Sequence, residues 1–101
     1  GGLSMAEAKR TLTTSELDAA LATLSGWELA DGKLRRQYRF TDFSEAFAFL
    51  ARVALLAEKS NHHPDIHNSW ASVTLELHSH DAGGVTRRDV ELATAIDTLD
   101  D

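Results

Sequence analysis

The stretch that determines the fold more than any other occupies residues 41–64 and reads TDFSEAFAFLARVALLAEKSNHHP. Its apolar residues recur at the spacing of one helical face, which predicts a long amphipathic helix running to about Lys59. The predicted stripe comprises Phe43, Ala46, Phe47, Leu50, Val53, Ala54 and Ala57. A helix of this kind should bury that stripe against a sheet.

Both ends of this helix carry recognisable signals. Thr41 or Asp42 can cap the first turn, and Glu45 can complete a capping box from Asp42. Pro64 disfavours a helical conformation at His63, so this histidine should lie on extended backbone just beyond the helix.

The preceding residues predict a helix and a hairpin. A TTS segment at residues 13–15 precedes apolar residues at helical spacing, and Gly26 is a natural stop. The apolar positions are Leu17, Ala20, Leu21 and Leu24. Asp31 and Gly32 then supply the positive φ angles of a tight turn between two strands. Leu34, Tyr38 and Phe40 share one face of the second strand.

The following residues predict another strand and a last helix. Residues 72–80 alternate, with Val73, Leu75 and Leu77 on one face and Thr74, Glu76, His78 and His80 on the other. Thr86 can cap a helix with Asp89 three residues on, and Leu92, Ala93, Ile96 and Leu99 form its apolar side. Because strands and helices do not alternate strictly, an α+β fold with an antiparallel sheet is favoured. This pattern alone reveals three strands.

Composition narrows the class of protein. The chain has 101 residues, of which 43% are hydrophobic, and we expect one domain over residues 5–101. Residues 1–4 precede Met5 and look like a remnant of protein expression. A net charge of −6 argues against nucleic acid as a partner. The absence of cysteine and of any apolar run near the roughly 18 residues of a membrane helix suits a cytoplasmic protein.

All five histidines lie between residues 62 and 80, which suggests a shared site. One interpretation is a metal centre, because His78 and His80 project from the same strand face. A third ligand could come from His62, His63 or His67, and a carboxylate from Glu58 or Asp65. Zinc or non-haem iron would accept such ligands, although the spacing is permissive rather than diagnostic.

The other interpretation is acid–base catalysis without a metal. Imidazole titrates near neutral pH, so one histidine can donate a proton while another accepts one. Glu58 lies four residues before His62 and could orient an imidazole. The histidine pattern alone leaves both interpretations open.

A longer pattern favours the second interpretation. EKSNHHP at residues 58–64, followed by Trp70, Leu75, His80 and Asp89, closely resembles the signature of the pterin-4a-carbinolamine dehydratases. The resemblance extends through GW at 26–27, RRQYRFTDFSEAFAFLARVALLAEK at 35–59 and GGVTRRD at 83–89. It covers the chain from about Leu12 to Leu99.

The resemblance implies both a reaction and a fold. The reaction is dehydration of 4a-hydroxytetrahydropterin to quinonoid dihydropterin, which supports tetrahydrobiopterin recycling after an aromatic amino acid hydroxylase has acted. No cofactor and no metal are implied. The fold is an antiparallel four-stranded sheet with helices on one face, in the order α-β-β-α-β-β-α, in homodimers or homotetramers. The fourth strand must then lie at about residues 66–70.

The resemblance also implies the site residues. The expected catalytic residues are His62, His63 and His80, with His62 and His80 as the acid–base pair and His63 binding and orienting the substrate. The expected substrate-binding residues are Glu58, Pro64, Ser79, Asp81, Ala82 and Asp89, the last of which can also cap the final helix.

The chain departs from the family pattern at the rim of the site. Asn61 stands where an acidic residue is common, and Ile66 where an aromatic residue is frequent. These departures bear on substrate preference rather than on reaction type. His67 and His78 lie outside the family's trio, so a variant lacking His78 is expected to keep most activity.

Two further roles are known among relatives of this kind. One is binding a transcription factor as a dimerisation cofactor or coactivator, and the other is a part in molybdopterin metabolism. Neither the acidic composition nor the motifs require them.

Overall fold

A computed structural model describes residues 9–100, so the predicted expression remnant at residues 1–4 lies outside the described residues. The helices are α2 (Thr14–Thr23), α3 (Phe43–Ser60) and α4 (Arg87–Asp97), followed by a short 3-10 turn, Thr98–Asp100. The strands are β1 (Glu28–Ala30), β2 (Lys33–Arg39), β3 (Asp65–Ser69) and β4 (Ser72–Leu77). The order α-β-β-α-β-β-α confirms the expected α+β fold.

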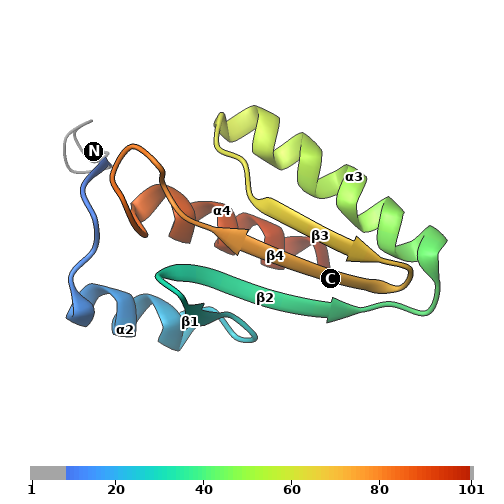
Figure 1. Ribbon diagram of the computed structural model, residues 1–101, viewed down its shortest axis with the longest axis horizontal. Helices are drawn as coiled ribbons and strands as arrows, with labels where there is room; N and C mark the ends of the chain where they lie inside the picture. The colour runs from blue at the N-terminus through green and yellow to red at the C-terminus, as the bar shows by residue number, and fades with distance from the viewer. Residues whose placement is uncertain (1–8, 101) are drawn as a thin grey trace.

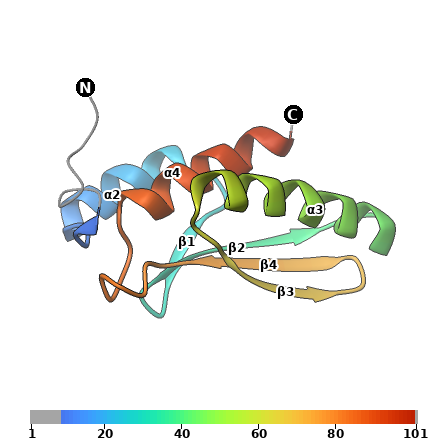
Figure 2. The ribbon, with the colours of Figure 1, turned by 90° about the horizontal axis from the view of Figure 1, so that it is seen from above.

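The strands form one antiparallel sheet in the order β1-β2-β4-β3, which places β3 at one edge (Figure 1). All three helices lie on the same face of this sheet (Figure 2). β3 is the strand that the periodicity did not reveal and that the resemblance placed at about residues 66–70. It ends at Ser69, and the next residue, Trp70, adopts a positive φ of 51° in the turn to β4. No helix among residues 9–100 combines the length and hydropathy needed to cross a membrane.

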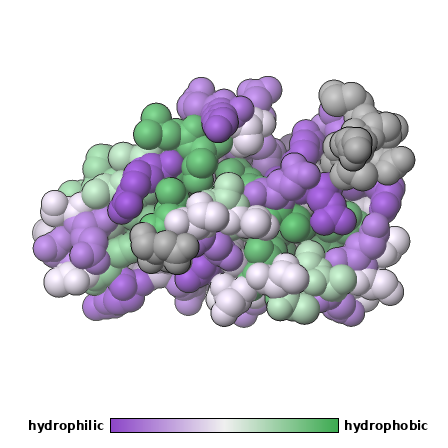
Figure 3. Space-filling model, turned by 180° about the vertical axis from the view of Figure 1, so that it is seen from behind, coloured by the Kyte–Doolittle hydropathy of each residue, from purple (hydrophilic) through white to green (hydrophobic). Residues whose placement is uncertain are grey.

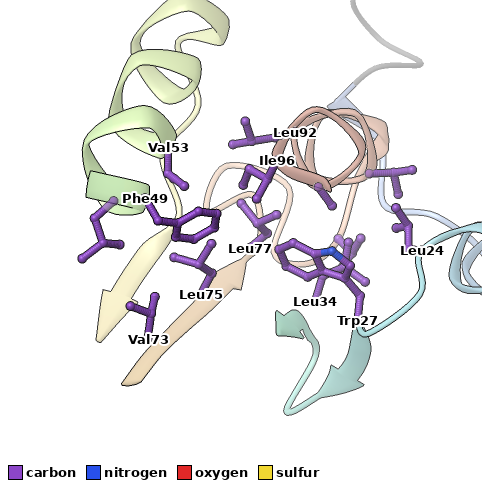
Figure 4. Packing of buried hydrophobic residues seen from close by; sticks show 14 of the residues in the cluster. Leu24, Trp27, Leu34, Phe49, Val53, Val73, Leu75, Leu77, Leu92 and Ile96 are labelled. Carbon is purple, nitrogen blue, oxygen red and sulfur yellow. The ribbon is translucent and has the colours of Figure 1, made fainter. Parts of the chain in front are cut away.

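The core lies between the sheet and the helices. Val73, Leu75 and Leu77 of β4 are almost completely buried, which confirms the predicted alternation. Phe49 and Val53 of α3 and Leu92 and Ile96 of α4 pack over them, while Leu24, Trp27 and Leu34 extend the core beneath α4 (Figure 4). The core therefore fixes α3 and α4 side by side over the end of β4.

The predicted apolar stripe of α3 was partly wrong. Phe49 is buried, whereas Phe43 and Phe47 are 46% and 58% exposed and Ala54 is also exposed. The buried positions are Ala46, Phe49, Leu50, Val53 and Ala57. Because α3 carries apolar residues on most of its circumference, periodicity alone could not identify the face that meets the sheet.

The start of α3 also differs in detail from the prediction. The Asp42 side chain accepts a hydrogen bond from the Glu45 N–H at 2.8 Å, as a cap should. The Glu45 carboxylate, however, accepts from the Thr41 N–H at 3.1 Å rather than from that of Asp42. The predicted capping box is therefore shifted by one residue.

Gly26 provides a test of the chain path after α2. Its φ is +89°, and a Cβ added there would lie 2.8 Å from Nε of Arg36, which is held by an ion pair to Asp97 at 2.7 Å. We expect Gly26→Ala to lower the free energy of unfolding by about 2 kcal/mol, measured by urea denaturation. Gly32→Ala is the matched control, since Gly32 has φ +75° but a Cβ added there would meet no atom within 4 Å. Equal losses in the two variants would show that contact with Arg36 is irrelevant.

Candidate active site

The two histidines that follow the C-terminus of α3, His62 and His63, lie in different environments. Asn61 adopts the left-handed conformation with φ 52°, and the His62 N–H donates to the Ala57 carbonyl at 3.1 Å. This arrangement is a common helix C-cap, and Pro64 then prevents any helical continuation. The His62 side chain is 11% exposed and turns inward, whereas the His63 side chain is 59% exposed.

A buried carboxylate holds His62. Oδ1 of Asp89 contacts Nε2 of His62, and Oδ2 accepts hydrogen bonds from the Ser79 hydroxyl at 2.9 Å and the Thr86 N–H at 2.8 Å. Because the Ser79 proton is directed to Asp89, the Thr86 hydroxyl must donate to Ser79, at 2.8 Å. Asp89 has no solvent exposure, so its carboxylate is shared among His62, Ser79 and Thr86 and does not contact solvent.

Local sequence explains why Asp89 lies there. Thr86 is the N-cap of α4, and Asp89 is the third residue of the helix, so the two form the predicted capping box. The helix N-terminus also favours a negative charge at this position. The same residue therefore caps α4 and contacts His62.

The loop after β4 brings His80 to the site. An isolated bridge joins Ser79 to Gly84, and the Ser79 carbonyl accepts from the N–H groups of Ala82 and Gly83 at 3.1 and 2.9 Å. A hydrogen bond from Arg88 to Asp81, at 2.6 Å, ties this loop to α4 and lowers the pKa of Asp81. His80 is exposed at the mouth of the loop.

These segments enclose a polar pocket of about 450 Å³. Its lining residues are Asn61, His62, His63, Pro64, Asp65, His78, Ser79, His80 and Asp81. A second, more apolar hollow of about 340 Å³ lies between α3 and α4, where Leu56, Leu92 and Ala95 line it. His62 borders both, so its imidazole separates the polar pocket from the apolar one.

The structure brings together most of the predicted site residues, but not all of them. The three predicted catalytic histidines line the polar pocket with Pro64 and Asp81. Ser79 also lines it, although its hydroxyl points to Asp89. Glu58 contacts His63 at 3.3 Å instead of His62, and the lining residues do not include Glu58, Ala82 or the fully buried Asp89.

Three pocket residues were not among the catalytic and substrate-binding residues that the resemblance implied. They are Asn61, Asp65 and His78. The alternation of residues 72–80 predicted His78 and His80 on one strand face, although β4 ends at Leu77, and Asp65 directly follows the HHP motif, so a signal for both was present in the sequence. Nε2 of His78 lies 3.2 Å from Nδ1 of His80, within hydrogen-bond distance.

The geometry does not assemble the ligand set of the alternative metal interpretation. Within residues 9–100, no three His, Asp or Glu side chains converge on a position that could hold a metal ion. His67 lies away from the pocket and faces Glu76 at 3.7 Å. The arrangement instead pairs two of the four pocket imidazoles, His62 and His80, with a hydrogen-bonding partner behind each.

Comparison with known proteins confirms the resemblance over nearly the whole chain. Residues 10–99 match the family model described as pterin 4 alpha carbinolamine dehydratase. A protein of Prochlorococcus marinus (strain MIT 9303), provisionally named pterin-4-alpha-carbinolamine dehydratase, is 53% identical over 89 residues, covering 88% of this chain and 93% of the relative. A relative with the same provisional name from Rhodopseudomonas palustris (strain HaA2) is 48% identical over 90 residues, covering 87% and 89% of the two chains.

Solved structures show the same similarity in three dimensions. A crystal structure described as a transcriptional coactivator/pterin dehydratase from Brucella melitensis superimposes with a TM-score of 0.85 at 40% identity, covering 89% of this chain and 98% of that one. A pterin dehydratase-like RuBisCO assembly factor of the alpha-carboxysome shares the fold, with a TM-score of 0.59 at 23% identity over 72% and 84% of the two chains. From the family match and these identities, the chain belongs to the pterin-4a-carbinolamine dehydratase family.

Proposed function

We propose that the protein dehydrates 4a-hydroxytetrahydropterin to quinonoid dihydropterin and water. The observation that carries this proposal is the placement of His62 and His80 in one polar pocket, with the buried Asp89 behind His62. Family membership supplies the substrate class. The polar pocket suits a pterin better than the apolar hollow does, because the pterin ring presents amide and amino groups that need hydrogen-bond partners.

The reaction needs two proton transfers and no net transfer of electrons. The bond between C4a and the hydroxyl oxygen breaks, and a proton from an acid lets that oxygen depart as water. A base removes the proton from the neighbouring ring nitrogen, whose electron pair forms the new double bond to C4a. His62 and His80 are the proposed acid–base pair, because both imidazoles line the same pocket.

The remaining pocket residues would bind and orient the pterin. His63 lies at the rim with Glu58 at 3.3 Å, so the carboxylate can hold the ring in one orientation. Asn61 offers a side-chain amide, and the backbone of residues 79–81 offers further polar groups. Asp81 remains ionised because Arg88 lowers its pKa, and it is held toward α4.

A direct assay tests this function. Purified protein is mixed with chemically generated 4a-hydroxytetrahydropterin, and dehydration is followed by absorbance against the spontaneous reaction. We expect saturable acceleration that disappears in a His62→Ala, His80→Ala double variant. A wild-type protein that leaves the spontaneous rate unchanged would refute the proposed function.

The metal interpretation is tested by chelation. Proton transfer between imidazoles needs no metal ion, so we expect protein dialysed against a chelator to retain full dehydration activity. Elemental analysis of the same sample measures its metal content. Stoichiometric metal, combined with loss of activity on chelation and recovery on adding the metal back, would overturn the acid–base mechanism.

We also propose a role in tetrahydrobiopterin recycling beside an aromatic amino acid hydroxylase in the cytoplasm. The proposed substrate is the carbinolamine that such a hydroxylase produces. Adding the protein to a hydroxylase and a dihydropterin reductase should therefore shorten the lifetime of the carbinolamine intermediate during turnover.

We propose that the protein is a homodimer or homotetramer. Phe43, Phe47, Leu55 and Trp70 are between 46% and 80% exposed, and strand β3 is an edge strand whose five residues are all exposed. Figure 3 looks onto the helical face, where apolar surface is most continuous on the side of α3. A domain this small gains stability by burying such surface in a second copy.

Multi-angle light scattering at micromolar concentration should give at least twice the 11.1 kDa chain mass. A single species of chain mass would contradict this proposal.

A further inference from the structure

His78 lies directly behind His80 in the proposed active site. Its Nε2 is 3.2 Å from Nδ1 of His80, and the two rings meet edge to face with centroids 4.1 Å apart. The His78 side chain is only 16% exposed, whereas His80 is exposed at the pocket mouth. We infer that His78 is a positioning residue, which holds His80 in the tautomer that accepts a proton from the substrate.

The other ring nitrogen of His78 faces a carboxylate. Oδ2 of Asp65 lies 3.9 Å from Nδ1 of His78, too far for a direct hydrogen bond but close enough for charge to act. Lys33 approaches the same oxygen at 4.0 Å and weakens this effect without removing it. The negative charge of Asp65 therefore favours the proton of neutral His78 on Nδ1.

The tautomer of His78 determines that of His80. With its proton on Nδ1, neutral His78 has only a lone pair on Nε2, so it accepts a hydrogen bond there. Nδ1 of His80 must then carry the proton and donate it across the 3.2 Å contact. Nε2 of His80 is left as a lone pair that can take a proton from the pterin ring nitrogen.

In His62 the contact favours a proton on the other ring nitrogen, Nε2. This Nε2 contacts the fully buried carboxylate of Asp89, an acceptor that favours a proton on that nitrogen. When Nδ1 is protonated as well, it can donate its proton to the departing hydroxyl. This inference rests on the proposed function and divides its roles: His62 is the acid, and His80 is the base.

The tautomer can be measured without any substrate. Long-range ¹H–¹⁵N correlation spectra, recorded on the full chain at a pH where the imidazoles are neutral, distinguish an Nδ1 proton from an Nε2 proton. We expect His80 to be in the Nδ1–H form in the wild type and in the Nε2–H form in His78→Phe, which keeps a ring but has no acceptor. His78→Gln should retain the Nδ1–H form, because its side-chain oxygen can reach the place of Nε2 and accept.

Kinetics provide a second readout with a matched control. His78→Phe should lower kcat about tenfold, the usual worth of one hydrogen bond, with little change in KM, and His78→Gln should restore most of the loss. This revises the sequence-based expectation that a variant lacking His78 keeps most activity. His67→Phe is the control, since His67 lies on the same sheet but faces Glu76 and is 71% exposed.

The two readouts separate this inference from the proposed function. A wild-type His80 in the Nε2–H form, or a tautomer unaffected by His78→Phe, would overturn the role of His78 even if the enzyme is fully active. Absence of dehydration activity in a wild type with His80 in the Nδ1–H form would instead refute the proposed function and leave the hydrogen bond established. Equal losses of kcat in His78→Phe and His67→Phe would also count against the positioning role.

Discussion

His62→Ala is expected to lower kcat for dehydration by roughly 10²–10⁴-fold, the range that a positioned general acid contributes. The imidazole lines the polar pocket and contacts the buried carboxylate of Asp89, and unlike the Ser79 hydroxyl it can act as a general acid near neutral pH. Its removal leaves the departing hydroxyl without a proton donor, so the loss should fall on kcat more than on KM. Stopped-flow absorbance with chemically generated carbinolamine measures the rate.

Two further histidine variants make this result specific. His80→Ala should lose activity in the same range, because the proposed reaction needs an acid and a base together. His67→Ala should keep nearly wild-type activity, since His67 does not line the pocket. Near-native rates in both His62→Ala and His80→Ala would eliminate the proposed acid–base pair.

Asp89→Ala is expected to reduce both stability and activity. The substitution leaves the Thr86 N–H and the Ser79 hydroxyl without their acceptor inside the protein and removes half of the α4 capping box. Buried groups left without partners cost about 1–3 kcal/mol each, so we expect a loss of about 3 kcal/mol in the free energy of unfolding. The kcat should fall by about 100-fold, because His62 also loses the carboxylate that holds its ring in position.

Urea denaturation followed by circular dichroism measures the stability change. Glu91→Ala is a matched control, because Glu91 lies on the exposed side of the same helix and should change stability by less than about 0.5 kcal/mol. Asp89→Asn separates the two effects, since it keeps an acceptor for the hydrogen bonds but carries no charge. If Asp89→Asn had wild-type kcat, the charge behind His62 would have no role in catalysis.

The elements with a clear local signal were predictable. In β4 the strict alternation of Val73, Leu75 and Leu77 identified the buried face, because only one face of this sheet meets helices. The cap of α4 was equally clear, since Thr86 and Asp89 are three residues apart at the start of an apolar repeat. β3 carried no apolar alternation, and all five of its residues are exposed, so only the family resemblance indicated it.

Features that depend on contacts between distant segments were less predictable. The buried face of α3 depends on how Phe49 meets the sheet, and the helix is apolar enough to allow other orientations. The sequence indicated that Asp89 belongs to the site, but not that it is buried behind His62. The partner of Glu58 was likewise missed, because the left-handed Asn61 turns His62 inward and leaves His63 beside that carboxylate.

The contact between His62 and Asp89 also has a consequence for protein synthesis. The two residues are 27 positions apart, and Asp89 is placed only when the first turn of α4 has formed. A nascent chain on the ribosome presents its histidines first and receives the carboxylate later, with a delay on the order of seconds at ordinary elongation rates. Chains released before residue 89 would carry all five imidazoles and still lack the carboxylate behind His62, so the proposed acid gains its buried partner only after the first turn of α4 has been translated.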